Sequence, residues 1–382
     1  MNKPYVYTPG PTNVRENVRL ARAIETTNPD LDLSFYEYYK CLCMKIAEIL
    51  ETKNDVFILG GEGILGLEAA CASITEPGDR VLIIDNGVFG EGFKDFIKIY
   101  GGEYVLYSVD RKNPIDIEEL KRYLDKDNDF KFATVVHCDT PSGVLNDISK
   151  ICPLLKSYGI LTVVDSVAGM IGEELKVDEW KIDIVLGGSQ KAFSAPPGLT
   201  IVTISNDVYK VMDERRIPIS GFYCNLGIWK NYFENKWFPY TMPVSDIYGL
   251  GVAVNNIIEE GKELVQERHH KIAQATRKSL EKYGFNLYLE SGYASTVTVI
   301  EPPVGFTANS IIDHMQLKYN ILIAGSFDYL KNKVIRIGHM GENANIGAIT
   351  YVLNCLDLSM RDLGYIPKFN LIDEFNNEYN KY

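Results

Sequence analysis

Short apolar runs alternate with amphipathic stretches over residues 55–205 of this chain. The runs are continuous rather than alternating, which is typical of strands buried on both faces. The candidate strands are Val81–Ile84, Tyr104–Tyr107, Thr134–His137, Leu161–Val164, Ile184–Leu186 and Thr200–Ile204. The stretches between them that predict helices include Glu91–Tyr100, Ile117–Leu124 and Ile148–Tyr158. This alternation predicts βαβ units, and therefore an α/β domain with a mostly parallel sheet between helices.

The pattern changes after residue 205. An aromatic-rich segment broken by prolines is followed by a long helical stretch from about Ser245 to Tyr283. Beyond it we expect a small C-terminal α+β domain, whose elements lie near Thr296–Ile300, Ser310–Lys318, Val334–Ile337 and Ala344–Leu363. The polar end, Lys368–Tyr382, is expected to dock loosely or fray. We therefore predict a large cofactor-binding domain over 15–255 and a small domain over 256–382 that also takes in 1–14.

Composition narrows the functional class. The 382 residues are 46% hydrophobic and 24% charged, with a formal net charge of −12, which indicates a globular protein without the basic face of a nucleic-acid binder. No apolar run reaches the roughly 20 residues of a membrane span, and the N-terminus lacks a signal-peptide core. Seven scattered cysteines favour reduced thiols and a cytoplasmic location. Cys41 and Cys43 form a lone C-x-C, which we interpret as helix residues, so no metal site is expected.

An acid and a lysine each follow a buried run. Asp165 ends Val163-Val164-Asp165-Ser166, and Lys191 ends Gly188-Ser189-Gln190-Lys191. In an open α/β sheet, ligands bind at such strand ends. Pyridoxal phosphate needs both groups, because a lysine forms a Schiff base with its aldehyde and an acid keeps its pyridine nitrogen protonated. Lys191 and Asp165 are therefore the candidate catalytic residues, although a lone aspartate there could also cap a turn.

A glycine turn, Gly60-Gly61-Glu62-Gly63, opens a helical stretch and could hold a phosphate on free N–H groups. A dinucleotide loop is the alternative, but the spacing gives no clean G-x-G-x-x-G with an acid about 20 residues on. Glu62 does not suit a phosphate, because a carboxylate beside a dianion is unfavourable by about 1 kcal/mol or more.

At or after the ends of three other predicted strands lie residues that suit a flat heterocycle and its substrate. Phe89 lies between glycines and could stack on a ring. Thr140, in His137-Cys138-Asp139-Thr140-Pro141-Ser142-Gly143, belongs to a polar run that could reach the oxygen on that ring. Arg336 suits a substrate carboxylate, although an isolated arginine is also compatible with a surface salt bridge.

Together these motifs resemble the class V, fold-type I, pyridoxal-phosphate-dependent aminotransferases, over nearly the whole chain from Thr8-Pro9-Gly10-Pro11 to beyond Arg336. The resemblance implies an aminotransferase that acts on a small amino donor and a 2-oxo acid. It makes Lys191 the Schiff-base lysine, Asp165 the pyridine partner, Phe89 the stacking ring and Arg336 the substrate arginine, with Gly10 near the substrate. It also implies a homodimer, or a higher oligomer, with shared active sites. The residues that the resemblance assigns to cofactor binding are Gly61, Glu62, Gly63, Phe89, Thr140, Asp165, Gln190, Lys191, and Tyr240 and Thr241 from the neighbouring subunit.

Within that family, four motifs are most similar to the pyridoxamine–pyruvate aminotransferases, which use free pyridoxamine as a substrate in place of a tightly bound cofactor. These motifs lie at 61–70, 139–143, 195–200 and 336–341. Glu62 fits this branch, because a carboxylate accepts a hydrogen bond from a hydroxymethyl group. Gln190 favours the alternative, an alanine–glyoxylate or serine–pyruvate type that holds pyridoxal phosphate, whereas Pro141 departs from the alanine–glyoxylate pattern.

Three other functions remain as alternatives. A cysteine desulfurase needs a nucleophilic cysteine on a mobile loop, whereas Cys355 lies in a helical pattern and Cys224 lies near the domain join. A non-catalytic binder would have no need to retain Lys191, Asp165 and Arg336 together. A nicotinamide dehydrogenase would need the dinucleotide fingerprint that the chain lacks.

Overall fold

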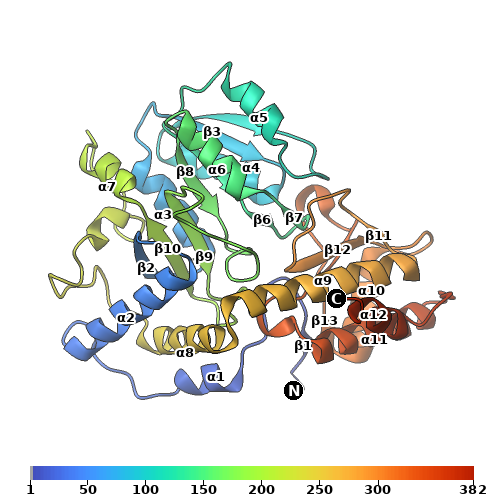
Figure 1. The fold of residues 1–382 in the computed structure, drawn as a ribbon. Coiled ribbons are helices and arrows are strands. Elements are labelled where there is room, and N and C mark those ends of the chain that lie inside the picture. Colours follow the sequence, from blue (N-terminus) through green and yellow to red (C-terminus); the bar gives the residue numbers. More distant parts are fainter. Residues whose placement is uncertain (1–2) are drawn as a thin grey trace.

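A seven-stranded sheet forms the centre of the larger part of the molecule (Figure 1) in the computed structural model, which describes residues 3–382. The strand order is β2-β10-β9-β8-β5-β3-β4. β10 is antiparallel to both of its neighbours, and the other contacts between neighbouring strands are parallel. The strands are β2 (Asp55–Gly60), β3 (Arg80–Asp85), β4 (Glu103–Ser108), β5 (Phe132–Val136), β8 (Leu161–Asp165), β9 (Ile184–Gly188) and β10 (Leu199–Ile204).

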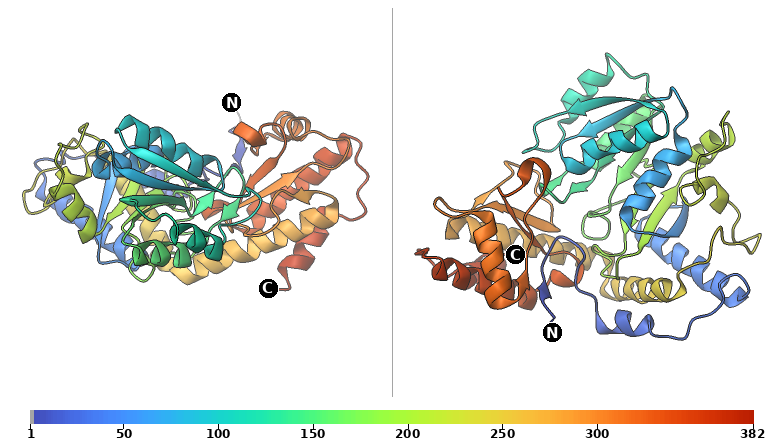
Figure 2. Two further views of the ribbon diagram at one scale, coloured as in Figure 1. Left: turned by 90° about the horizontal axis from the view of Figure 1, so that it is seen from above. Right: turned by 180° about the vertical axis from the view of Figure 1, so that it is seen from behind.

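Helices pack on both faces of this sheet (Figure 2), which confirms the predicted α/β architecture. The helices in contact with the sheet include α2 (Leu33–Ile49), α3 (Gly63–Ile74), α4 (Val88–Ile99) and α6 (Ile148–Ser157). α5 (Ile117–Leu124) packs on α6, α7 (Asn206–Asp213) packs on α3, and the short α1 (Glu16–Ala21) packs on α8 (Val244–Glu260). Cys41 and Cys43 lie on α2, as interpreted, with only Cys43 buried. The sequence pattern missed β2, because its four buried residues, Val56–Leu59, directly precede the glycine turn.

The long helical stretch predicted from Ser245 to Tyr283 is two helices, α8 (Val244–Glu260) and α9 (Lys262–Tyr283). Gly261 separates them with φ = +91°, a conformation that glycine adopts without steric cost. The amphipathic period continues across this break, so the periodicity alone indicated a single helix.

The C-terminal part contains a three-stranded antiparallel sheet in the order β11-β12-β14. Its elements are β11 (Asn286–Leu287), β12 (Val297–Glu301), β14 (Ile335–Gly338), α10 (Ala308–Tyr319), α11 (Ile346–Asp362) and α12 (Leu371–Tyr379). The expectation that Lys368–Tyr382 docks loosely was wrong. Leu371 and Phe375 of α12 are fully buried, and Glu378 accepts a hydrogen bond from Lys282 of α9 (Nζ to Oε1, 2.6 Å).

Shorter elements join the two parts. β1 (Tyr5–Val6) pairs in parallel with β13 (Ile321–Leu322), so the N-terminal residues lie on the C-terminal part. β6 (Cys138–Asp139) and β7 (Val144–Leu145) form a hairpin, and the 3-10 turns are η1 (Leu226–Trp229), η2 (Asp328–Leu330) and η3 (Gly341–Asn343). The domain boundary between 255 and 256 stays a prediction.

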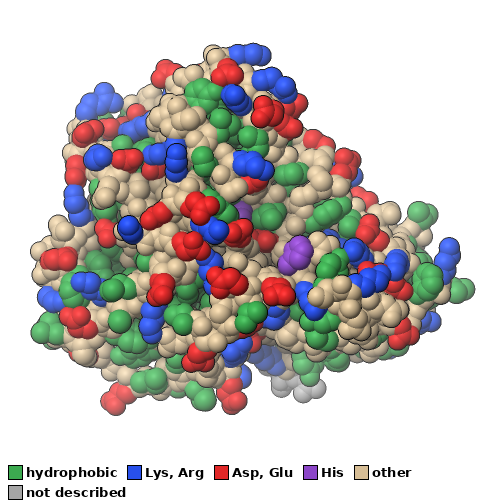
Figure 3. Space-filling model, in the orientation of Figure 1, with side chains coloured by type: hydrophobic (Ala, Val, Ile, Leu, Met, Phe, Trp, Pro, Cys, Tyr) green, Lys and Arg blue, Asp and Glu red, His purple; other side chains and the backbone are tan. Residues whose placement is uncertain are grey.

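Charged side chains of both signs are interspersed over the face shown in Figure 3. Over residues 3–382, no helix combines the length and the apolar character needed to cross a membrane.

Candidate active site

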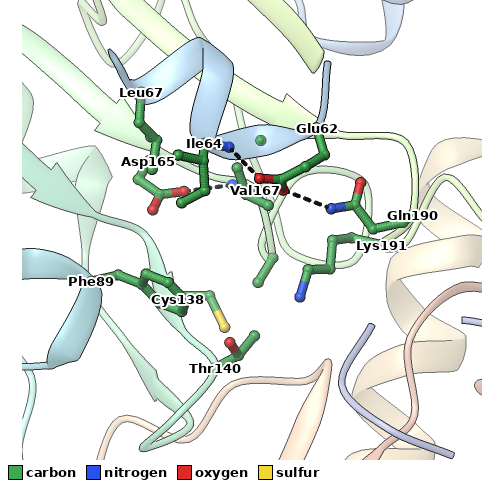
Figure 4. A pocket seen from close by; sticks show the side chains of 12 residues that line it. Glu62, Ile64, Leu67, Phe89, Cys138, Thr140, Asp165, Val167, Gln190 and Lys191 are labelled. Atoms are coloured by element: carbon green, nitrogen blue, oxygen red, sulfur yellow. Dashed lines mark hydrogen bonds between the residues drawn. The ribbon is translucent and has the colours of Figure 1, made fainter. Parts of the chain in front are cut away.

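Five loops meet at one edge of the large sheet. β2, β3, β5, β8 and β9 point the same way, so their carboxyl ends lie together, where open α/β sheets bind ligands. The loops that follow them enclose a pocket of about 170 Å³ (Figure 4). It is lined by Glu62, Gly63, Ile64, Leu67, Phe89, Cys138, Thr140, Asp165, Val167, Ala168, Gln190 and Lys191.

Lys191 extends from the loop after β9, and its amine points into the middle of this pocket (Figure 4). Its Nζ donates a hydrogen bond to the carbonyl of Pro9 (2.7 Å). Burial lowers the pKa of this amine to about 8. A lysine with a lowered pKa has more of the free amine that attacks an aldehyde, so its environment suits the predicted role.

Asp165 is the last residue of β8, and its carboxylate also lines the pocket. Its Oδ1 accepts a hydrogen bond from the Val167 N–H (2.9 Å), and within residues 3–382 no donor reaches Oδ2. Burial raises the pKa of this carboxyl to about 6. The free oxygen can therefore accept a strong hydrogen bond from a cationic N–H, and such a partner would favour the ionised carboxylate.

Glu62 is the N-cap of α3 at the other end of the pocket. One carboxylate oxygen accepts from the Ile64 N–H (3.2 Å), and the other accepts from Gln190 Nε2 (3.3 Å). The carboxylate thus takes a first-turn N–H and the Gln190 amide, both of which were expected to serve a phosphate. Gly63 lies directly against the pocket wall, since a Cβ there would be 2.8 Å from a methyl group of Val167.

Phe89 and Thr140 both line the pocket, and the Phe89 backbone is held by a residue that the sequence pattern did not single out, Asp139. Asp139 is buried behind them, where its Oδ1 accepts from the Phe89 N–H (3.1 Å) and its Oδ2 from the Ser142 hydroxyl (2.7 Å). Burial raises the pKa of Asp139. The sequence feature that could have identified Asp139 is its place in the run Asp-Thr-Pro-Ser-Gly, directly after a predicted strand. Cys138, also missed, contributes a buried thiol to the wall.

Arg336 lies on β14 beside this site and outside the residues that line the pocket. Its Nε donates to the Gly325 carbonyl (2.6 Å), and its Nη1 donates to the Thr140 carbonyl (3.3 Å). Burial lowers the pKa of Arg336 to about 10, and the charge of Asp139 opposes that shift. The Arg336 side chain is thus buried and hydrogen-bonded to backbone carbonyls beside the pocket, so it does not form a surface salt bridge.

The remaining predicted residues lie around the pocket. Gly10 packs against Lys191, because a Cβ on it would be 2.6 Å from Nζ. Gly61 precedes the α3 cap. Tyr240 lies behind β2, where its hydroxyl accepts from the Gly60 N–H (3.1 Å), and neither Tyr240 nor the exposed Thr241 lines the pocket of its own chain.

The residues fit the pyridine ring and the aldehyde of a pyridoxal group. The wall offers an amine for the aldehyde, a free carboxylate oxygen for the ring nitrogen and an aromatic side chain at its edge. Within residues 3–382 the only basic side chain that lines the pocket is Lys191, and the end that would receive a phosphate carries the Glu62 carboxylate. This geometry supports proton transfer at the carbon atom that bears the amino group of a bound substrate.

Comparison with known proteins identifies the family. Residues 27–304 match the model of the class-V aminotransferases. The chain is 36% identical over 371 residues to an uncharacterized aminotransferase of Methanocaldococcus jannaschii, covering 96% of this chain and 95% of that one. It is 31% identical over 363 residues to a pyridoxamine–pyruvate transaminase of Mesorhizobium japonicum, covering 93% and 92%.

Solved structures agree. The crystal structure of the ureidoglycine–glyoxylate aminotransferase of Bacillus subtilis superposes with a TM-score of 0.95 at 29% identity, covering 100% of this chain and 99% of that one.

Proposed function

The chain belongs to the class-V aminotransferase family, and on that premise we propose that it moves an amino group between a small donor and a 2-oxo acid, pyruvate or glyoxylate. The observation that carries the proposal is the joint placement of Lys191 and Asp165. The amine and the free carboxylate oxygen face one pocket, and their pKa values are shifted to about 8 and about 6, both near neutral pH. Groups that titrate near neutrality can exchange protons under working conditions.

Each residue has a separate part in this reaction. A bound pyridoxal ring supplies an electron sink for the bonds of the neighbouring carbon. Asp165 would hold a proton on the ring nitrogen. Lys191 would bind the aldehyde and, when free, carry the proton between the amine-bearing carbon of the substrate and the aldehyde carbon outside the ring. Arg336 pairs with the substrate carboxylate, and Phe89 packs on the ring.

The subtype we favour converts pyridoxamine and pyruvate into pyridoxal and L-alanine. Glu62 supports it, because its carboxylate accepts two hydrogen bonds at the place where a phosphate would need N–H donors. A hydroxymethyl group can donate to a carboxylate, whereas a phosphate dianion is repelled by it. The similarity to a pyridoxamine–pyruvate transaminase agrees with this choice.

The second candidate is an alanine–glyoxylate or serine–pyruvate type that holds pyridoxal phosphate. Gln190 favours it, since its Nε2 lies at the N-terminus of α3 and could donate to a phosphate if Glu62 turned away. The structural similarity to a ureidoglycine–glyoxylate aminotransferase also favours an acceptor such as glyoxylate. A cysteine desulfurase is disfavoured, because Cys355 is buried on α11 and Cys224 is half-buried outside the pocket.

Two measurements separate these subtypes. Full-length protein purified without added cofactor is assayed for phosphorus, and the favoured subtype predicts none held tightly. Pyridoxamine, alanine, serine and aminoethylphosphonate are then offered with pyruvate or glyoxylate, and the fastest turnover is expected for pyridoxamine with pyruvate. One phosphate per subunit, with alanine or serine as the faster donor, would replace this subtype by the second.

We further propose a homodimer, or a higher oligomer, in the cytoplasm. Phe222, Tyr223 and Trp237 are each about half exposed, near the segment that carries Tyr240 and Thr241. In a shared site, Thr241 would reach the pocket of the partner chain. Light scattering tests the association, and a Thr241→Ala variant with weaker cofactor binding would support the shared site.

A further inference from the structure

A segment near the N-terminus, Tyr7–Asn13, crosses the active site between the two parts of the chain, and we refer to it as the strap. At one end Tyr7 is held by the C-terminal part: its N–H donates to the Leu322 carbonyl and its carbonyl accepts from the Gly338 N–H, both at 2.7 Å. At the other end the Thr12 N–H donates to the Gln190 carbonyl (3.0 Å). The strap thus bridges β14, which carries Arg336, and the loop that carries Lys191.

The middle of the strap holds the lysine amine. The Pro9 carbonyl accepts the Lys191 Nζ hydrogen bond at 2.7 Å. The next residue is Gly10, with φ = +96°, and an added Cβ would lie 2.6 Å from both Nζ and Cδ of Lys191. A glycine is therefore required for the amine to reach this carbonyl.

The opposite side of the strap is in direct contact with β14. A Cβ on Gly338 would lie 2.1 Å from the Thr8 carbonyl oxygen, so backbone packs on backbone without an intervening side chain. Asn13 fixes the end of the strap, because its Nδ2 donates to the Val6 carbonyl (3.1 Å) and to Asn343 Oδ1 (2.8 Å). Gly338 and Asn13 therefore help to set the position of the Pro9 carbonyl, although neither of them contacts Lys191.

We propose that the strap is a positioning element for Lys191, in which the Pro9 carbonyl holds the amine whenever it is not bound to the aldehyde and β14 determines where that carbonyl lies. This inference rests on the proposed function, in which Lys191 both binds the aldehyde and carries the proton. The strap then directs the released amine to one place beside the reacting carbon.

The strap also affects when the amine is neutral. A carbonyl oxygen accepts a stronger hydrogen bond from an ammonium group than from an amine, so Pro9 favours the charged lysine, whereas burial opposes it. The other groups that act on Lys191 are Cys138 of β6, Asp165 of β8 and Glu62 at the α3 cap, which favour the charged form, and Arg336 of β14, which disfavours it. Displacing the strap should therefore lower the pKa of Lys191 further.

The test measures the free amine directly. Full-length protein is mixed with pyridoxal at a series of pH values and reduced with borohydride, and the initial rate of adduct formation on Lys191 is followed by peptide mass mapping. The variants are Gly338→Ala, which pushes on Thr8 from β14, and Asn13→Ala, which loosens the end of the strap. Gly347→Ala on α11 is the control, because its Cβ would meet only Asn345 Oδ1 at 3.5 Å.

We expect the midpoint of the rate profile to move to lower pH by about one unit in both strap variants, and to stay in place in Gly347→Ala. A strap with only a structural role would lower the melting temperature and leave the midpoint unchanged, which would overturn the inference. If Gly338→Ala does not fold, Asn13→Ala alone decides between these outcomes. Adducts on exposed lysines while Lys191 stays unmodified at every pH would refute the proposed function instead.

Discussion

Replacing Glu62 by glutamine is expected to change which form of the cofactor the protein prefers. Glutamine keeps the shape and can still accept from the Ile64 N–H, and its NH2 group can donate to the Gln190 oxygen once the Gln190 amide rotates. The main change is therefore the loss of the charge. For the magnitude we take a phosphate about 5 Å from the carboxylate, a close contact of like charges. At that separation, in water, each unit of like charge costs about 0.8 kcal/mol, or about 1.7 kcal/mol for a dianion. Because 1.4 kcal/mol is a factor of ten, the affinity ratio of pyridoxal phosphate to pyridoxal should rise about 10- to 20-fold.

The assay is a titration of full-length protein with each aldehyde at low and at high salt. Glu68→Gln is the matched control, because Glu68 lies on the same helix and accepts a hydrogen bond from Tyr100 (2.8 Å) away from the pocket. The effect of Glu62→Gln should shrink at high salt, since Glu62 is exposed and its charge is screened. An unchanged ratio, or an equal change in the Glu68 control, would refute the electrostatic reasoning.

Three further outcomes follow from the geometry. Asp165→Asn should lower turnover about 100- to 1,000-fold with the fold intact, and an unchanged rate in steady-state assays would reduce Asp165 to a turn cap. Arg336→Ala should raise the KM for the 2-oxo acid about 10- to 100-fold, as expected for loss of a charged hydrogen bond, and an unaltered KM would place the carboxylate elsewhere. Glu173 has a folded-state pKa raised to about 7 by burial, so it binds more protons folded than unfolded, and its stabilising contribution is lost as pH rises from about 4.5 to 7. The melting temperature of Glu173→Gln relative to wild type should therefore increase over that range, and a constant difference would contradict the shift.

Much of the fold could be predicted because buried parallel strands leave a plain signature in the sequence. Six continuous apolar runs gave six strands of the large sheet to within two residues at each end. The errors arose where tertiary context decides the structure. Gly261 ends one helix and begins another within an unbroken amphipathic period, and the polar segment that forms α12 is ordered by two residues, Leu371 and Phe375, that pack into a core built elsewhere in the chain.

The candidate site was predictable where chemistry coincides with strand ends. Lys191 and Phe89 follow predicted strands, Asp165 ends one, Glu62 lies in the predicted glycine turn, and all four line one pocket. Asp139 was passed over because its role is to hold other groups, and hydrogen bonds to a neighbouring N–H and hydroxyl leave no pattern in a single sequence. The contact between Lys191 and the Pro9 carbonyl joins residues 182 positions apart, so only the folded chain could reveal it.

The central claim is that Lys191 performs amino-group transfer in this chain. The direct test follows L-alanine formed from pyridoxamine and pyruvate, and from serine and pyruvate with added pyridoxal phosphate, in wild type and in Lys191→Ala. The wild type should turn over repeatedly with at least one donor, and the variant should show no steady-state turnover with any, because no other side chain lining the pocket within residues 3–382 is an amine. Sustained alanine production by Lys191→Ala would contradict the claim.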